Sequence, residues 1–253
     1  MSVSIIKNSV FMHKASHLYY TPWEYTNSVW APGSTTYDIV EILADTVSIE
    51  QGDPTTETVD WEFGDTPLMS SSTKGERTVT AACIDMSFDI MKNVFGWTVD
   101  TGSIMASEGA SGESYATMVL TFHSTAAPMV VLPKVSMNAK TTIGTLKTST
   151  GQAELTGTAM SAYIEYDTAS ASTEIAFIKP IVGVDITIAN SESVASTSGI
   201  AIGTVDTDYS GNYVLSSSGG GGGSTITPYP VGGSTPSAVA QTTTATVLAI
   251  PVQ

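Results

Sequence analysis

Acidic side chains concentrate between residues 48 and 65, where no lysine or arginine balances them. The carboxylates there are Glu50, Asp53, Glu57, Asp60, Glu62 and Asp65. Two carboxylates with separated pKa values are sufficient for glycoside hydrolysis, and clustered carboxylates also bind metal ions. A stretch with so many acids contains such pairs by chance, so the cluster alone does not indicate an enzyme.

Two histidines have a spacing that occurs in metal sites. His13 and His17 are four residues apart, which on a helix would place both imidazoles on one face. The surrounding residues are only weakly helical, however, and no glutamate lies inside the pair to complete a hydrolytic zinc motif. A metal site is therefore not the favoured interpretation.

A short stretch near the C-terminus resembles part of a calcium-binding loop. Asp206, Asp208 and Ser210 supply oxygen atoms at the first, third and fifth positions, and Gly211 occupies the sixth. Ser217 stands where such a loop needs a bidentate glutamate. We therefore favour a β-hairpin turn, with calcium binding as the alternative.

Motifs for covalent or phosphate chemistry are absent from the sequence. It contains no G-x-S-x-G elbow, no G-x-x-x-x-G-K-[ST] loop and no paired C-x-x-C. The single cysteine, Cys83, excludes an intrachain disulfide, and we expect it to be a buried thiol. We expect no enzymatic activity, no metal and no cofactor.

Composition excludes several classes of partner. The chain has 253 residues and a formal charge of -15, so stable binding to nucleic acid or anionic lipid is not expected. No apolar stretch approaches the roughly 20 residues that span a bilayer, and the N-terminus does not read as a signal peptide. We expect a protein that is soluble and has no membrane partner.

The elements that would position these residues are mostly strands. Residues 1–36 combine many aromatic residues with Pro22, Pro32 and Gly33, so we expect an extended arm there without a long strand. Residues 47–50 alternate as in a half-buried strand, and alternation resumes at residues 78–86. Turn residues at 66–67 and 70–75 lie between them, which predicts a long hairpin with a flexible tip.

One segment changes to a helical period. The spacing of Phe88, Met91 and Phe95 predicts a short amphipathic helix over residues 87–95, with Ser87 as its cap and Gly96 as its stop. We expect these three apolar side chains to pack the helix against a sheet.

Two further hairpin-like units follow, over residues 113–144 and 150–167. In the second, Ala153, Leu155, Gly157, Ala159, Ser161 and Tyr163 alternate with polar residues, which places them on one face of a strand. The predicted fold is mainly β: an antiparallel β-sandwich or barrel over residues 37–188 with one flanking α-helix.

The C-terminal part has a different composition. Residues 189–253 form a predicted Gly/Ser-rich extension, in which Asp208 is the last charged residue. The final segment, "TTTATVLAIPVQ", regains the pattern of a strand. We expect it to return to a sheet edge, in its own subunit or in a neighbour.

The acidic cluster is part of a longer region that contains acidic residues and no basic ones. Between Ala15 and Thr73 there are ten acids and no lysine or arginine. A surface built for solubility alone is the plainest interpretation, but such surfaces normally mix both signs. The exclusively negative charge also indicates a surface that repels another polyanion.

Three features of residues 37–97 resemble the core of tail tube proteins, the major tail proteins of long-tailed bacteriophages, especially those of Bacteroides-like hosts. They are a strand that ends in "EQGDP", a polar hairpin that closes on "KGERTVTAACID" and the segment "SFDIMKNVFG" directly after it. The similarity continues loosely to Ile188 and does not reach the Gly-rich region.

The resemblance implies a virion protein, assembled in the host cytoplasm, whose hexameric rings stack into a hollow tube. Its partners would be its own copies, other phage tail proteins and double-stranded DNA in transient passage. Six copies would carry a charge of about -90 per ring, which repels DNA within a Debye length of about 8 Å. Glu57, Asp60 and Glu62 would then face the lumen or the contact between rings.

Other functions are also compatible with the sequence. A head decoration protein or a tail terminator would have a similar all-β composition. A cell-surface adhesin-like β-sandwich module would also fit the Ser/Thr-rich strands, although it requires an export signal.

Overall fold

A computed structural model describes residues 14–39, 42–43, 45–59, 69–84, 92–94, 98–100, 103–105, 114–124, 127–142, 152–190, 199–216 and 225–228. This part of the chain is mainly β, as the sequence predicts. Its strands pair antiparallel, except for one parallel pair. Two larger sheets and two short ribbons contain all of the described strands.

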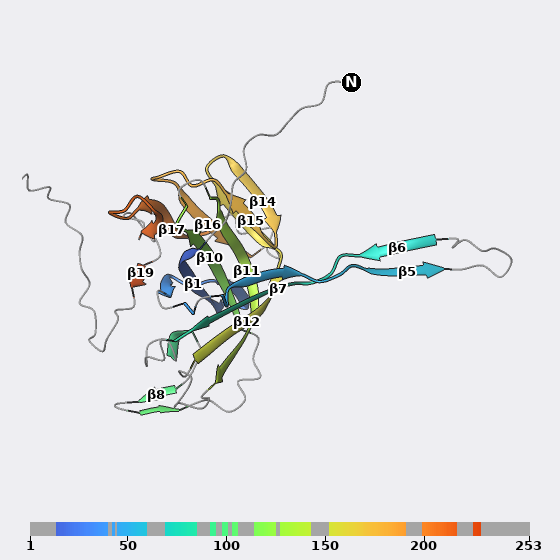
Figure 1. Ribbon diagram of the computed structural model, residues 1–253, viewed down its shortest axis with the longest axis horizontal. Helices are drawn as coiled ribbons and strands as arrows, with labels where there is room; N and C mark the ends of the chain where they lie inside the picture. Colours follow the sequence, from blue (N-terminus) through green and yellow to red (C-terminus); the bar gives the residue numbers. More distant parts are fainter. Residues whose placement is uncertain are drawn as a thin grey trace, which may run out of the picture.

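The larger sheet has ten strands (Figure 1). They are β1 (Ala15–Thr26), β2 (Val29–Pro32), β3 (Thr35–Ile39), β4 (Ser48–Gln51), β7 (Arg77–Cys83), β10 (Tyr115–Phe122), β11 (Met129–Thr142), β12 (Gln152–Met160), β15 (Ala176–Ile178) and β19 (Thr225–Pro228). The order is β19-β3-β1-β10-β11-β12-β7-β4, with β15 paired to β11 and β2 to β1. The predicted hairpin of residues 113–144 is confirmed as β10 and β11.

The second sheet has five strands in the order β14-β13-β16-β17-β18. They are β13 (Ala162–Tyr166), β14 (Ala169–Thr173), β16 (Asp185–Ala189), β17 (Ile200–Thr207) and β18 (Tyr213–Ser216). The two ribbons pair β5 (Thr55–Val59) with β6 (Met69–Thr73), and β8 (Thr98–Asp100) with β9 (Ser103–Met105).

Hydrophobic side chains cover both faces of the ten-stranded sheet. On β10, Met118 and Leu120 belong to one buried cluster, whereas Val119 belongs to a second. The second cluster also contains residues of the five-stranded sheet, such as Ile186 and Ile202, so that sheet covers one face of the larger one. Strands buried on both faces read as continuous apolar runs, which explains "ATMVL" in β10.

The first cluster unites strands that are not neighbours in the sheet. Leu18 of β1 and Val79 of β7 both belong to it, although three strands separate β1 from β7. Beyond β3, Ile42 forms an isolated bridge with Cys83, and Leu43 N donates to Ala82 O at 2.8 Å. The sheet therefore curves strongly around this cluster, in which Cys83 is buried as expected.

The predicted alternation is confirmed along β12. Ala153 and Leu155 are buried in the first cluster, and a Cβ on Gly157 would lie only 2.5 Å from Val135 Cγ1. The prediction that Ser161 and Tyr163 continue this face is wrong. The chain leaves the larger sheet after Met160 and enters the smaller one at β13, so β12 and β13 do not form a hairpin.

The expected N-terminal arm is wrong for residues 15–36. They form β1, β2 and the start of β3, and Tyr19, Tyr20 and Trp23 are buried in the chain's own body. Pro22 fits because it lies at the end of the pairing between β1 and β10, where its carbonyl oxygen accepts a hydrogen bond from Gly33 N at 2.8 Å. Residues 1–13 lie outside the described residues.

A lysine is buried against the aromatic residues of this region. Lys134 of β11 is 4% exposed, and its Nζ lies 4.3 Å from the ring centre of Tyr115 and 5.1 Å from that of Trp23. The Trp23 Nε1 group in turn donates to Thr117 Oγ1 at 2.9 Å. Cation–π contacts of this kind stabilise a buried ammonium group.

The expected boundary between the core and a C-terminal extension after residue 188 is also wrong. That position lies inside β16, which pairs with β17. Ile202, Val205 and Leu215, from the supposed extension, are buried in the second cluster. The Gly-rich run and the final segment lie outside the described residues.

The predicted helix cannot be followed in the structure. Phe88, Met91 and Phe95 lie outside the described residues, so their packing against a sheet stays a prediction. Val94, from the same segment, is buried in the first cluster, and its carbonyl oxygen accepts a hydrogen bond from Tyr20 Oη at 3.5 Å.

The burial of β17 in the core has a measurable consequence for stability. Ile202 is fully buried, so Ile202→Ala should lower the free energy of unfolding by about 2–5 kcal/mol through lost burial and a cavity. Val182→Ala, at a side chain that is 56% exposed, is the control and should change it by less than about 0.5 kcal/mol. Urea unfolding measures both, and equal effects would mean that β17 contributes nothing to the core.

Candidate functional site

A hairpin that projects from the body is the candidate functional site (Figure 1). Its inner part pairs β4 with β7, from Ser48 opposite Thr80 to Gln51 opposite Arg77. Its outer part pairs β5 with β6, from Thr55 opposite Thr73 to Val59 opposite Met69. The predicted long hairpin is thus confirmed, but residues 70–73, expected in a turn, are strand.

Two glycines form the junction between the inner and outer parts. Gly52 N donates to Glu76 O at 2.8 Å. A Cβ on Gly75 would lie 2.1 Å from Gly52 O and 2.7 Å from Asp53 O. The two backbones therefore approach so closely that a side chain at position 75 cannot fit.

The outer part of the hairpin buries none of its side chains. All residues of β5 and β6 are exposed, including Val59 at 56% and Met69 at 67%. Two-stranded hairpins are at best marginally stable in water without a covered face. The exposed ribbon is therefore a candidate surface for contact with another chain.

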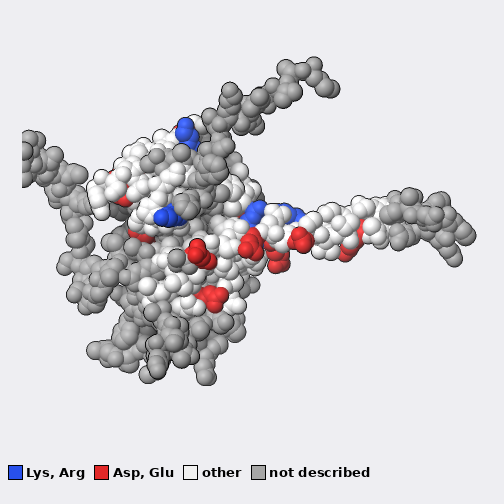
Figure 2. Space-filling model, viewed as in Figure 1, with Lys and Arg blue, Asp and Glu red and all other residues white. Residues whose placement is uncertain are grey.

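Acidic side chains follow the hairpin without cationic partners. Glu50, Asp53, Glu57 and Glu76 are exposed, and none has an ion pair among the described residues. Figure 2 shows red acidic atoms along one side of the hairpin and blue basic atoms on the other side of its base. Of the predicted site residues, Glu57 lies in the middle of β5, whereas Asp60 and Glu62 lie outside the described residues.

The basic residues at the hairpin base form contacts with a carboxylate of the body. Lys74 forms an ion pair with Glu174, and Arg77 Nη1 lies 3.6 Å from Glu174 Oε2. Arg77 Nη2 also donates to Gln51 Oε1 at 2.8 Å. Glu174 lies between β14 and β15, so this pair of contacts ties the hairpin to the body. No local sequence pattern joins residues so far apart, and the sequence did not predict this anchor.

The structure describes one histidine of the pair. His17 lies in β1 and not in a helix, and His13 is outside the described residues. His17 Nδ1 instead lies 2.9 Å from Asp38 Oδ2. This hydrogen bond raises the pKa of His17 above its usual value, and nearby carboxylates add to the effect.

The calcium-like stretch forms the turn between β17 and β18. Asp208 Oδ1 accepts hydrogen bonds from Ser210 N at 2.8 Å and Asn212 N at 2.9 Å. Asp206 Oδ1 accepts one from Thr207 N at 2.8 Å. The hairpin-turn interpretation is therefore confirmed, and these oxygens serve the turn itself.

In the residues described, no three His, Cys, Asp or Glu side chains come together as a possible metal site. Within the same part of the chain, no helix has the length and apolar character needed to cross a membrane.

Removing the anchor should release the hairpin while leaving the fold intact. Exposed ion pairs contribute about 0–1 kcal/mol, so Glu174→Gln should barely change the urea midpoint. The distance between spin labels at Thr56 and Ser170, measured by electron paramagnetic resonance, should become more widely distributed. Glu165→Gln, at an exposed carboxylate of β13, is the control. An unchanged distribution in Glu174→Gln would show that the anchor does not hold the hairpin.

The His17–Asp38 pair should make stability depend on pH. Because the folded pKa of His17 is raised, the pair stabilises the protein fully below about pH 6.5, the usual pKa of histidine. This contribution is lost as the pH rises through the raised value. Urea unfolding between pH 5.5 and 9 should show the loss in the wild type and not in His17→Gln. His123→Gln, at an exposed histidine, should retain the wild-type dependence.

No protein-family model matches the chain, and no curated protein matches its sequence.

Proposed function

We propose that the chain is a structural subunit of a bacteriophage tail tube. Copies of it form hexameric rings, and the rings stack into a hollow conduit through which double-stranded DNA passes. The protein is then part of the virion tail, assembled in the host cytoplasm, with other tail proteins as further partners. The observation that carries this proposal is the projecting hairpin, with its exposed faces and unpaired carboxylates.

The proposed body is a β-sandwich or barrel. The strong curvature around the first cluster supports a barrel-like larger sheet, and the cluster shared by both sheets supports their face-to-face packing. A body of this kind is rigid enough to hold the hairpin in a fixed direction. The flanking helix of residues 87–95 remains part of this proposal.

The hairpin is suited to bind another copy. Its exposed pair of strands lacks a covered face, and Val59 and Met69 lie opposite each other at its described outer end. In a ring or a stack of rings, a neighbouring subunit would cover one side of this ribbon. The other side would remain in contact with water.

Unpaired acids suit a surface that DNA passes without binding. Phosphates and carboxylates repel each other within a Debye length, which is about 8 Å in physiological salt. Because Lys74 and Arg77 are engaged by Glu174, they do not offset this repulsion by binding phosphates. We assign Glu57, Asp60 and Glu62 to the lumen or to the contact between rings.

Electron microscopy distinguishes this function from its alternatives. Purified protein in a salt series should form rings or hollow filaments, because salt screens the repulsion between acidic copies. A head decoration protein would instead form small closed oligomers, and an adhesin-like module would remain a monomer. A monomer at every concentration and salt would contradict the proposal.

Charge reversal tests the acidic lumen. Tubes of Glu57→Lys/Asp60→Lys/Glu62→Lys should retain linear duplex DNA in co-sedimentation, because lysines bind phosphates, and the retention should fall steeply with salt. Wild-type tubes should retain almost none. The control, Glu165→Lys/Asp185→Lys/Asp206→Lys, makes the same charge change at exposed acids of the five-stranded sheet. If this control retains as much DNA as the hairpin variant, the three hairpin acids do not line the path.

A further inference from the structure

An unprotected edge strand borders the five-stranded sheet. β14 ends the strand order and, among the described residues, pairs only with β13. Its sequence, "ASAST", contains neither a charge nor a proline, and four of its five residues are exposed. Edge strands of monomeric proteins usually carry charges, prolines or bulges that prevent pairing with another chain. β14 therefore has the properties of an edge that receives a further strand.

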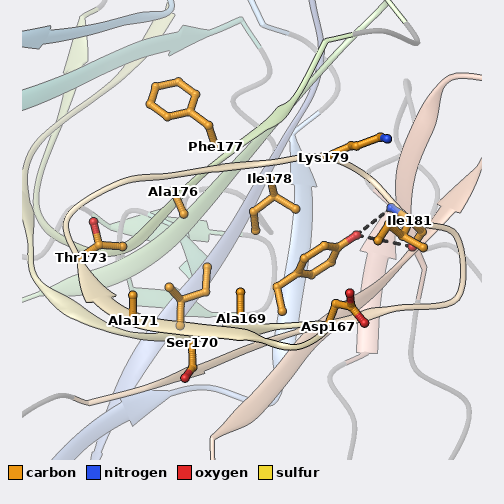
Figure 3. A pocket seen from close by; sticks show the side chains of 12 residues that line it. Asp167, Ala169, Ser170, Ala171, Thr173, Ala176, Phe177, Ile178, Lys179 and Ile181 are labelled. Carbon is orange, nitrogen blue, oxygen red and sulfur yellow. Dashed lines mark hydrogen bonds between the residues drawn. The ribbon is translucent and has the colours of Figure 1, made fainter.

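An apolar cavity lies directly beside this edge. It is open to solvent, has a volume of about 340 Å³ and is lined by β13, β14 and the segment from β15 to Ile181. Figure 3 shows Ala169, Ala171 and Ile178 directed into it and Ser170 directed away. The small side chains of β14 leave this space unfilled, and Ile164, the partner of Ala171 on β13, also lines it.

The walls of the cavity are held in place, and its rim is apolar. Tyr166 Oη accepts a hydrogen bond from Ile181 N at 2.7 Å, which fixes the segment after β15. Phe177 at the rim is 59% exposed, and Ile181 is 44% exposed. Apolar rims next to an open edge are typical of sites that bind an extended chain by strand addition.

The sequence itself contains a segment that fits this site. Residues 242–252, "TTTATVLAIPV", lie outside the described residues and contain no charge. In a strand, Leu248 and Ile250 would point to one face, and the small residues Val247 and Ala249 to the other. Pro251 is compatible with an outermost strand, where a missing N–H group is tolerated.

We propose that residues 242–252 of a second copy add to β14 as a strand and place Leu248 and Ile250 in the cavity. The choice of a second copy rests on the proposed function, in which copies of the chain lie side by side. Residues 229–241 span about 40 Å when extended, which is sufficient to reach a neighbouring subunit.

Cysteine pairing between separately prepared full-length chains tests this contact. One chain carries Ser172→Cys, on the face of β14 directed away from the cavity, and the other carries Val247→Cys or Ala249→Cys. One of these pairs should form a covalent dimer at least about tenfold faster than a control pair with Gly221→Cys, because strand pairing brings the thiols within bonding range. The native Cys83 is 2% exposed and common to all chains.

Blocking the cavity provides a second test with the full chain. Ala171→Glu should abolish the cross-link, while circular dichroism verifies that the fold is intact. Hydrogen exchange of residues 169–173 should accelerate at least about tenfold in Leu248→Lys/Ile250→Lys, as strand hydrogen bonds are lost. The control Gly221→Lys/Gly223→Lys adds the same charge outside the segment and should leave this exchange unchanged.

The outcomes separate this inference from the proposed function. Cross-linking no faster than the control, with unchanged exchange in β14, would overturn the inference. A Ser172→Cys/Ala249→Cys double variant that links only within one chain would also overturn it. Rings or tubes that form despite either result would leave the proposed function standing. A covalent dimer from a protein that never forms rings would support the strand addition and contradict the tube.

Discussion

Burial of both faces of the ten-stranded sheet is the constraint on which the structure depends. β10 and β11 carry apolar side chains at consecutive positions, so each needs a cover on either side. Curvature of the sheet encloses one cluster, and the five-stranded sheet covers the other. The core therefore requires the five-stranded sheet. It includes buried residues as far along the chain as Leu215 of β18. The apolar cavity beside β14 marks the corner where this cover is incomplete.

Charge follows the same division between the packed interior and the exposed surface. Lys134 packs against aromatic rings in the body, while Lys74 and Arg77 at the base of the hairpin contact Glu174. The carboxylates along the hairpin lie in water, as do exposed acids of the body such as Glu165 and Asp185. The hairpin acids differ from these in lying on an element that projects from the core (Figure 2). The proposed function draws on this placement.

Regular alternation made part of the fold predictable. β12 has one buried face and one polar face, so its inward residues were identified correctly, and the hairpin was recognised from two alternating runs around turn residues. Features that depend on distant contacts were not predicted. β1 was missed because Pro22 and Gly33 resemble loop residues locally, although pairing with β10 and β3 tolerates both. The change of sheet at Ser161 and the anchor at Glu174 leave no periodic signal in the sequence.

The close approach of Gly52 and Gly75 also sets the reach of the outer hairpin. The strands beyond this junction extend about seven residues to Val59, or roughly 23 Å at 3.3 Å per residue. A rotation of about 10° at the junction would displace that end by about 4 Å, comparable to the spacing of two paired strands. In the proposed assembly, such a rotation would align adjacent copies without any rearrangement of the packed interior.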